Sequence, residues 1–223
     1  MSRKGSSMRS APFSGDSLHP EGTVLFVVGT DTEVGKTRLV EELIRFSSER
    51  SRLKVVKAVQ TGVDSPGETP DSGRYLRTGL APEQVWEGYR FARPLDPMTA
   101  ARLEGRRIDP ELLSDRIRRF HDEGLRVVVE GAGGILSPFF PDGTGILSLM
   151  RHIDRPMTIL LVSHPHLGTL SSTLAAVRIL GEEGLPPRAL LLCHRPGVRD
   201  DAATENPQTL RSLLSPLPVY EFA

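Results

Sequence analysis

Residues 23–37 read TVLFVVGTDTEVGKT, and this stretch decides the fold. Its first six residues form a short, almost wholly apolar run, which is typical of a strand buried on both faces of a sheet. The apolar side chains that follow it recur at helical spacing: Leu39, Val40, Leu43, Ile44 and Phe46. The order is therefore strand, loop, helix, and the loop ends in Gly-Lys-Thr.

The loop has the properties of a phosphate-binding loop. Backbone N–H groups of the loop and of the helix N-terminus point at one place, where the helix dipole also favours an anion. Gly35 allows a close approach of the backbone, Lys36 reaches the β and γ phosphates, and the Thr37 hydroxyl binds Mg²⁺. The strict motif G-x-x-x-x-G-K-[ST] requires glycine at position 30, where this chain has Thr30, and its first glycine is Gly29. The prediction therefore rests on the structural context of the loop.

The strand and helix patterns repeat along the chain. Further strands are predicted for residues 54–60, 125–130, 156–163 and 189–193, and helices for residues 110–123 and 169–183. This alternation predicts an α/β fold of the P-loop NTPase type, with three layers and a mostly parallel sheet covered by helices on both faces. Ligands bind beyond the carboxyl ends of such strands. We therefore expect the functional side chains in the loops after residues 28, 60, 130 and 163.

Composition narrows the class of protein. The chain has 223 residues, with 28 basic and 28 acidic side chains, so its charge favours neither nucleic acid nor an anionic membrane as a partner. The lone Cys193 excludes an intrachain disulfide framework, and no stretch is apolar and long enough to span a bilayer. We expect a cytoplasmic protein with a disordered leader at residues 1–22, for which a transit peptide is the alternative, and a single P-loop domain at residues 23–223.

Four polar side chains stand at the predicted strand ends or in the loops after them. Lys57 lies near the end of the second strand, where its ammonium can face a migrating phosphoryl group. Glu130 ends an apolar strand and suits a magnesium ligand, as does Asp71. Thr61 can donate a hydrogen bond to a substrate. The alternatives are a salt-bridged or solvated lysine, a solvated strand-end glutamate, and a turn hydroxyl that bonds its own backbone.

These segments together resemble the dethiobiotin synthetase family. The loop GTDTEVGKT at residues 29–37 is similar to the phosphate loop of that family, extra residue included. The segments KAVQTG at residues 57–62, EGAGG at residues 130–134 and LGT at residues 167–169 agree with it in order and spacing, as does the proline-rich stretch at residues 89–101. The resemblance therefore spans the chain after the predicted leader.

The resemblance implies an ATP- and Mg²⁺-dependent ligase. In this family 7,8-diaminopelargonate takes up CO₂ on one amine, ATP phosphorylates the resulting carbamate, and the second amine closes the ring to give dethiobiotin, ADP and phosphate. Lys57 and Lys36 are then the catalytic residues, and Thr37, Asp71 and Glu130 are the metal ligands. If Leu76 is aligned with the leucine of the family, however, Ser72 and not Asp71 takes the acidic position.

The resemblance also assigns the binding residues. The implied nucleotide-binding residues are Thr32, Glu33, Val34, Gly35, Lys36, Thr37, Arg38, Asp71, Glu130, Gly131, Ala132, Gly133 and His194. The implied substrate-binding residues are Lys57, Thr61, Gly168, Thr169 and Ser171. The resemblance implies a homodimer, in which the last three residues of one subunit hold the carboxylate of the substrate bound to the other. Ser171 and His194 replace asparagines of the family, which puts tail binding and the base preference in question.

Three other functions are weighed against the synthetase. Nucleotide-switch ATPases of the partitioning type carry an additional lysine early in the loop, where this chain has Asp31. An amide-forming ligase for a larger carboxylate is disfavoured by the short chain, and a decayed nucleotide-binding paralogue is the third alternative. His164 and His166 suggest a metal site only weakly, since no third ligand is evident, and a loop or dimer-interface role is favoured for them.

Overall fold

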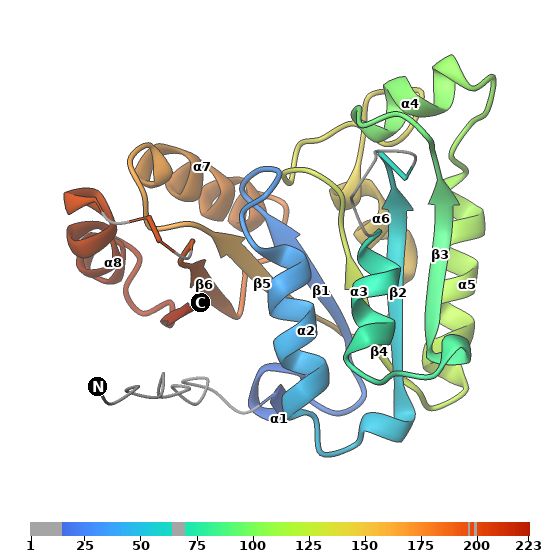
Figure 1. The fold of residues 1–223 in the computed structure, drawn as a ribbon, viewed down its shortest axis with the longest axis horizontal. Helices are drawn as coiled ribbons and strands as arrows, with labels where there is room; N and C mark the ends of the chain where they lie inside the picture. Colours follow the sequence, from blue (N-terminus) through green and yellow to red (C-terminus); the bar gives the residue numbers. More distant parts are fainter. Residues whose placement is uncertain (1–14, 64–69, 196, 199) are drawn as a thin grey trace, which may run out of the picture.

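The strand that precedes the phosphate-binding loop lies in the interior of a seven-stranded parallel sheet (Figure 1). The computed structural model describes residues 15–63, 70–195, 197–198 and 200–223. The strand order is β3-β2-β4-β1-β5-β6-β7. The strands are β1 (Val24–Gly29), β2 (Leu53–Gln60), β3 (Val85–Arg90), β4 (Arg126–Glu130), β5 (Met157–Ser163), β6 (Ala189–Cys193) and β7 (Val219–Phe222).

Helices cover both faces of the sheet. They are α1 (Gly15–Leu18), α2 (Lys36–Phe46), α3 (Asp71–Arg77), α4 (Pro97–Leu103), α5 (Pro110–Asp122), α6 (Ile146–Ile153), α7 (Thr169–Glu182) and α8 (Asp201–Leu213). Two short 3₁₀ helices occupy Arg50–Arg52 and Pro82–Gln84. The three-layer α/β fold and the five strands expected from the sequence are confirmed, with boundaries that differ by one residue at most.

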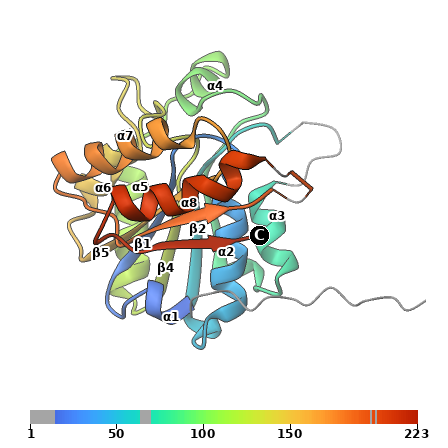
Figure 2. The ribbon, with the colours of Figure 1, turned by 90° about the vertical axis from the view of Figure 1, so that its left-hand side faces the viewer.

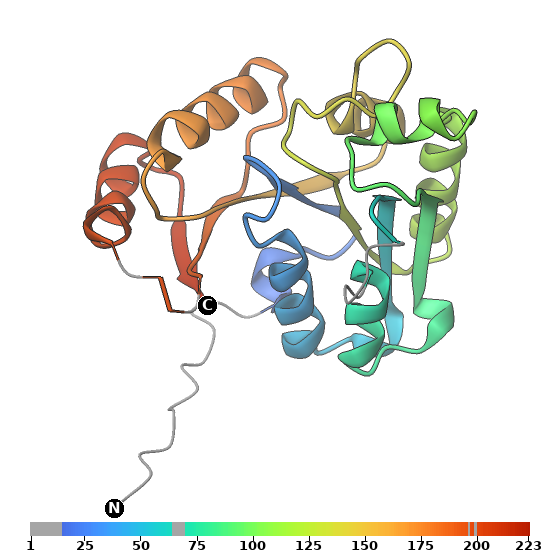
Figure 3. The same cartoon turned by 45° about the horizontal axis from the view of Figure 1, so that its top comes forward.

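Each face of the sheet has its own hydrophobic core. The helices α1, α2 and α3 pack on one face, where Leu39 and Val40 of α2 meet Leu25 and Val27 of β1. The other helices, α4 to α8, pack on the opposite face, against residues such as Phe26. Figure 3 shows α2 and α3 on one side of the sheet and α6 and α7 on the other. In Figure 2, α8 lies between α7 and β7.

The two edge strands are the ones that the sequence pattern did not predict. All residues of β1 and β4 are buried, whereas β3 has none that is fully buried and β7 has one, Phe222. An edge strand is covered less completely, so its sequence lacks the continuous apolar run that marks a central parallel strand. In the described part of the chain, no helix is long and apolar enough to cross a membrane.

The expected disordered leader is wrong for residues 15–22. Gly15–Leu18 form α1, Leu18 is buried in the core beside α2, and His19 is only 4% exposed. A guanidinium N–H of Arg126 donates to the backbone carbonyl of His19 at 2.5 Å. Burial lowers the pKa of His19 to about 4. The rest of the predicted leader, residues 1–14, lies outside the described residues, as does most of the loop at residues 63–70.

Candidate active site

The P-loop, residues 29–37, joins β1 to α2 at the carboxyl edge of the sheet. Gly35 has a φ of 103°, and a Cβ there would lie 2.5 Å from both the Cβ and the Sγ of Cys193. Both the backbone conformation and the close approach of β6 therefore require glycine at this position. Burial raises the pKa of the Cys193 thiol to about 11, which fits a packing role and not a nucleophile.

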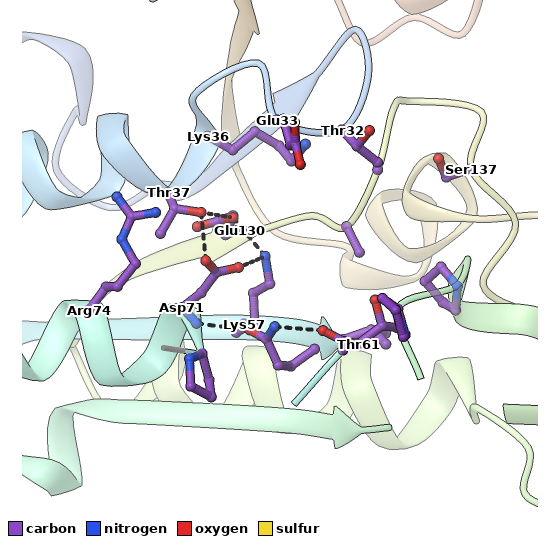
Figure 4. A pocket seen from close by; sticks show the side chains of 18 of the residues that line it. Thr32, Glu33, Lys36, Thr37, Lys57, Thr61, Asp71, Arg74, Glu130 and Ser137 are labelled. Carbon is purple, nitrogen blue, oxygen red and sulfur yellow. Dashed lines mark hydrogen bonds and ion pairs between the residues drawn. The ribbon is translucent and has the colours of Figure 1, made fainter. Parts of the chain in front are cut away.

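Lys36 folds back over the loop. Its Nζ donates a hydrogen bond to the backbone carbonyl of Asp31 at 2.8 Å, and its side chain is almost fully buried. Burial and the neighbouring ammonium of Lys57 lower its pKa to about 8. The loop thus places a cation beside the start of α2, where backbone N–H groups and the helix dipole favour a polyphosphate (Figure 4).

Lys57 and Glu130 come together because their strands are neighbours in the sheet. The two residues are direct partners in the parallel pairing of β2 with β4, so their side chains leave the same face. The Nζ of Lys57 lies 2.7 Å from Oε1 of Glu130, and both side chains are buried. Burial alone would lower the pKa of Lys57, but the charges of Glu130 and Asp71 outweigh it and raise the pKa.

Asp71, the first residue of α3, supplies a second carboxylate. Its Oδ2 lies 2.6 Å from Nζ of Lys57, and its backbone N–H donates to Oε1 of Gln60 at 3.1 Å. Burial would raise its pKa, but the charge of Lys57 outweighs this and lowers it. Of the two residues considered for the acidic position, the structure brings the carboxylate of Asp71 to Lys57, while Ser72 has no charge to offer.

The Thr37 hydroxyl joins the two carboxylates. Its Oγ1 lies 2.9 Å from Oδ1 of Asp71 and 2.9 Å from Oε1 of Glu130. A hydroxyl and two carboxylates are the hard oxygen donors that suit Mg²⁺ beside a nucleotide. Within the described ranges, no group of three or more His, Cys, Asp or Glu side chains is arranged to hold a metal by itself. These donors therefore fit a cation whose remaining ligands are phosphates and water.

Tyr75 is part of this cluster and was missed by the sequence analysis. Its hydroxyl donates a hydrogen bond to Oε2 of Glu130, and its side chain is completely buried. Burial and the charge of Glu130 raise its pKa well above the ordinary value. The signal in the sequence is its position four residues after Asp71, which puts both side chains on one face of a helix.

The side chains of Lys36, Thr37, Lys57, Asp71 and Glu130 line a cavity of about 1030 Å³ (Figure 4). Of the expected nucleotide-binding residues, the cavity is lined by Thr32, Glu33, Gly35, Lys36, Thr37, Arg38, Asp71, Glu130, Ala132 and Gly133. Lys57 and Thr61 line it as well, and so does the proline-rich turn at residues 94–97. The cavity therefore has a phosphate side at the P-loop and a second side between Thr61 and that turn, with Lys57 near both.

Six expected site residues are not part of this lining: Val34, Gly131, Gly168, Thr169, Ser171 and His194. Val34 is buried in the core beside α2, and the Gly131 backbone N–H bonds Val27. The hydroxyl of Thr169 is enclosed between Ser163 and Thr173. The other two substrate-binding candidates, Gly168 and Ser171, are exposed at the start of α7.

His194, the last of the expected nucleotide-binding residues, follows β6. Its Nε2 pairs with Oε2 of Glu221 at 2.8 Å. A neighbouring residue, Arg195, reaches the P-loop carbonyl of Glu33 at 3.5 Å, so the segment after β6 runs beside the P-loop. His166 pairs with Asp200 at 3.0 Å, and the described residues bring no third metal ligand to it and His164.

The chain is similar to a known family over most of its length. Residues 23–219 match a family model described as an AAA domain. The chain is 36% identical to the ATP-dependent dethiobiotin synthetase BioD of Streptomyces coelicolor, over 82% of this chain and 76% of that protein. It is 34% identical to the enzyme of the same name from an Anaeromyxobacter species, over 89% of each chain.

The chain belongs to the dethiobiotin synthetase family. A third member, from Bacillus subtilis subsp. natto, is 31% identical over 84% of this chain and 81% of its own length. The segments that carry the resemblance to dethiobiotin synthetases, at residues 29–37, 57–62 and 130–134, meet around the cavity, although they are far apart in the chain. The resemblance to dethiobiotin synthetases accounts for these segments without a partitioning-type ATPase function.

Proposed function

We propose that this chain is a dethiobiotin synthetase that converts 7,8-diaminopelargonate, CO₂ and ATP into dethiobiotin, ADP and phosphate. The observation that carries the proposal is the position of Lys57. Its ammonium lies between the carboxylates of Asp71 and Glu130, beside the P-loop and at the wall of the cavity. The proposed unit is a single P-loop synthetase domain at residues 23–223.

The nucleotide binds on the P-loop side of the cavity. Backbone N–H groups of the loop hold the β and γ phosphates, and Lys36 leaves the carbonyl of Asp31 to pair with them. Thr37, Asp71 and Glu130 would hold Mg²⁺, which supplies charge neutralisation for the phosphates. Arg38 lines the same side and would contact the nucleotide beyond the β phosphate.

The diamine binds on the side of Lys57 and Thr61. One amine adds to CO₂ and loses a proton, which gives a carbamate anion. A carbamate oxygen attacks the γ phosphorus and ADP leaves. The second amine then attacks the carbonyl carbon and loses a proton to solvent, and phosphate departs as the cyclic urea forms. Each step concentrates negative charge on oxygens near Lys57, whose buried ammonium stabilises this charge. Thr61 donates a hydrogen bond to the carbamate.

A homodimer would complete the substrate site. Leu167 is 86% exposed and Leu136 is 65% exposed, and a subunit interface would cover these two large apolar side chains. Leu167 directly precedes Gly168 and the start of α7, where backbone N–H groups and the Ser171 hydroxyl suit a carboxylate. We therefore propose that α7 of one subunit holds the tail of the substrate in the other, and that the enzyme works in the cytoplasm, where ATP is available.

The base preference of the enzyme depends on His194. A histidine donates and accepts through single ring nitrogens, and Nε2 is engaged by Glu221. Adenine would therefore meet the remaining nitrogen, Nδ1, instead of an asparagine amide. We propose ATP as the natural nucleotide, as in the names of the relatives.

The test is a direct assay of product. The purified protein is incubated with 7,8-diaminopelargonate, bicarbonate, Mg²⁺ and one nucleoside triphosphate at a time, and dethiobiotin is measured by mass spectrometry together with free phosphate. We expect dethiobiotin and phosphate in equal amounts, with ATP as the best nucleotide. Phosphate release at a rate that does not depend on the diamine would favour a switch-type ATPase. Nucleotide binding with no product would indicate a decayed paralogue, and either result would reject the proposal.

A further inference from the structure

Tyr75 is a buried polar residue that the mechanism above does not use. Its side chain is completely buried in the core between α2, α3 and the sheet, where phenylalanine would fill nearly the same space. A hydroxyl in such a place is costly unless it makes a hydrogen bond. This hydroxyl makes one, to the carboxylate of Glu130, which is also completely buried.

The two oxygens of Glu130 have separate partners. Oε1 accepts from Lys57 at 2.7 Å and from Thr37 at 2.9 Å. Oε2 accepts from Tyr75, and this is the one hydrogen bond that the described residues give to that oxygen. The tyrosine therefore fixes the plane of the carboxylate, and Oε1 faces the Thr37 hydroxyl as a result.

The helix α3 links both carboxylates of the site. Asp71 and Tyr75 are four residues apart and lie on one face of this helix. Asp71 reaches Thr37 directly, whereas Tyr75 acts on Thr37 through Glu130. Tyr75 is not among the residues that line the cavity, so it touches neither the nucleotide nor the substrate.

We propose that Tyr75 is a positioning residue that orients Glu130 toward the Mg²⁺ of a bound nucleotide. This inference rests on the proposed function, because it assigns Tyr75 to the metal site of the synthetase. Partners that orient a metal-binding carboxylate typically contribute a factor of 10 to 100 in metal affinity. Removal of the hydroxyl should therefore weaken the binding of Mg²⁺ and leave the binding of the phosphates by the P-loop unchanged.

The test separates these two contributions. The dissociation constant of a non-hydrolysable ATP analogue is measured by calorimetry in EDTA and in excess Mg²⁺. The constant in EDTA divided by the constant in Mg²⁺ gives the gain in affinity that the metal provides. For Tyr75→Phe we expect an unchanged constant in EDTA and a ratio about 10-fold smaller than in the wild type. Tyr75→Leu, which also lacks the hydroxyl, should show the same reduced ratio.

The control is Tyr89→Phe. This tyrosine lies on β3, and its hydroxyl accepts a hydrogen bond from the backbone of Asp109 outside the site. The control should keep the wild-type ratio. An unchanged ratio in Tyr75→Phe would overturn the inference alone, and equal weakening in EDTA and in Mg²⁺ would mean that Tyr75 only supports the fold. If the affinity of the wild type for the ATP analogue does not depend on Mg²⁺, the proposed metal site and this inference are both incorrect.

Discussion

Replacing Lys57 with methionine should destabilise the protein strongly. The substitution keeps most of the side-chain volume but removes the ammonium between Asp71 and Glu130, at 2.6 Å and 2.7 Å. The side chain of Glu130 is 1% exposed and that of Asp71 is 20% exposed, so little solvent can replace the lost charge. Removing one partner of a buried ion pair costs about 3–5 kcal/mol. For a protein of this size we expect the melting temperature to fall by about 6–20 °C.

The loss should also depend on pH. In the wild type the pKa of Asp71 is lowered, so this group stabilises the fold above its unfolded pKa and loses that contribution as the pH falls. In Lys57→Met the carboxylate of Asp71 has lost its cation, and protonation of this group then relieves the loss. The difference in the free energy of unfolding between wild type and variant should therefore be larger at about pH 8 than at about pH 5.

Urea unfolding followed by circular dichroism at both pH values measures this difference. The matched control is Lys54→Met on the same strand, because Lys54 is only partly buried and its ammonium contacts a backbone carbonyl instead of a carboxylate. We expect the free energy of unfolding of that control to fall by no more than about 1 kcal/mol. If it falls by the same amount in both variants, the electrostatic account of the cluster is incorrect.

Three further predictions concern the loop and the N-terminal segment. Gly35→Ala should lower the free energy of unfolding by about 2–5 kcal/mol, because it combines a left-handed backbone with a clash against Cys193. Thermal melts should show no such loss for Gly181→Ala, where a helix has open space for the methyl group. Lys36→Ala should weaken binding of an ATP analogue by about 10- to 100-fold, whereas a substitution of Lys57 should mainly lower the turnover rate, and equal loss of affinity in both would contradict this division. Because the pKa of His19 is lowered from 6.5 to about 4, the unfolded chain binds more protons between these values, and about 3 kcal/mol of stability should disappear as the pH falls through them. A stability profile that is no steeper than that of His19→Asn would contradict the assignment.

The central part of the fold could be predicted because burial leaves a clear pattern. A strand such as β4 is apolar on both faces, so its sequence alone identifies it. The edge strand β3 contains Gly88 and two charged residues, and it is recognisable only from its pairing with β2. The helix α8 contains Pro207. Because a proline inside a helix removes a backbone hydrogen bond, the sequence argues against a helix here, although the structure accommodates the proline.

The part of the site whose side chains are carried by strands could be predicted from the sequence. Lys57 and Glu130 could be placed on one edge of the sheet from topology alone, and their direct register makes them neighbours. The contribution of Tyr75 depends on how α3 packs above that edge, which no local pattern determines. The expected role of α7 remains a prediction, since it needs a second subunit. The polar composition of residues 1–22 predicts disorder, but it gives no sign that Leu18 is buried.

The cavity floor holds two ammonium groups, from Lys36 and Lys57, and two carboxylates, from Asp71 and Glu130. Their charges cancel, and the whole chain carries no net charge either. The net charge of the chain therefore does not steer a nucleotide from a distance, and the encounter depends on the charges that line the cavity itself, among them Arg38, Arg74 and Arg77. Discrimination begins only after contact, when short-range hydrogen bonds replace the water around the phosphates.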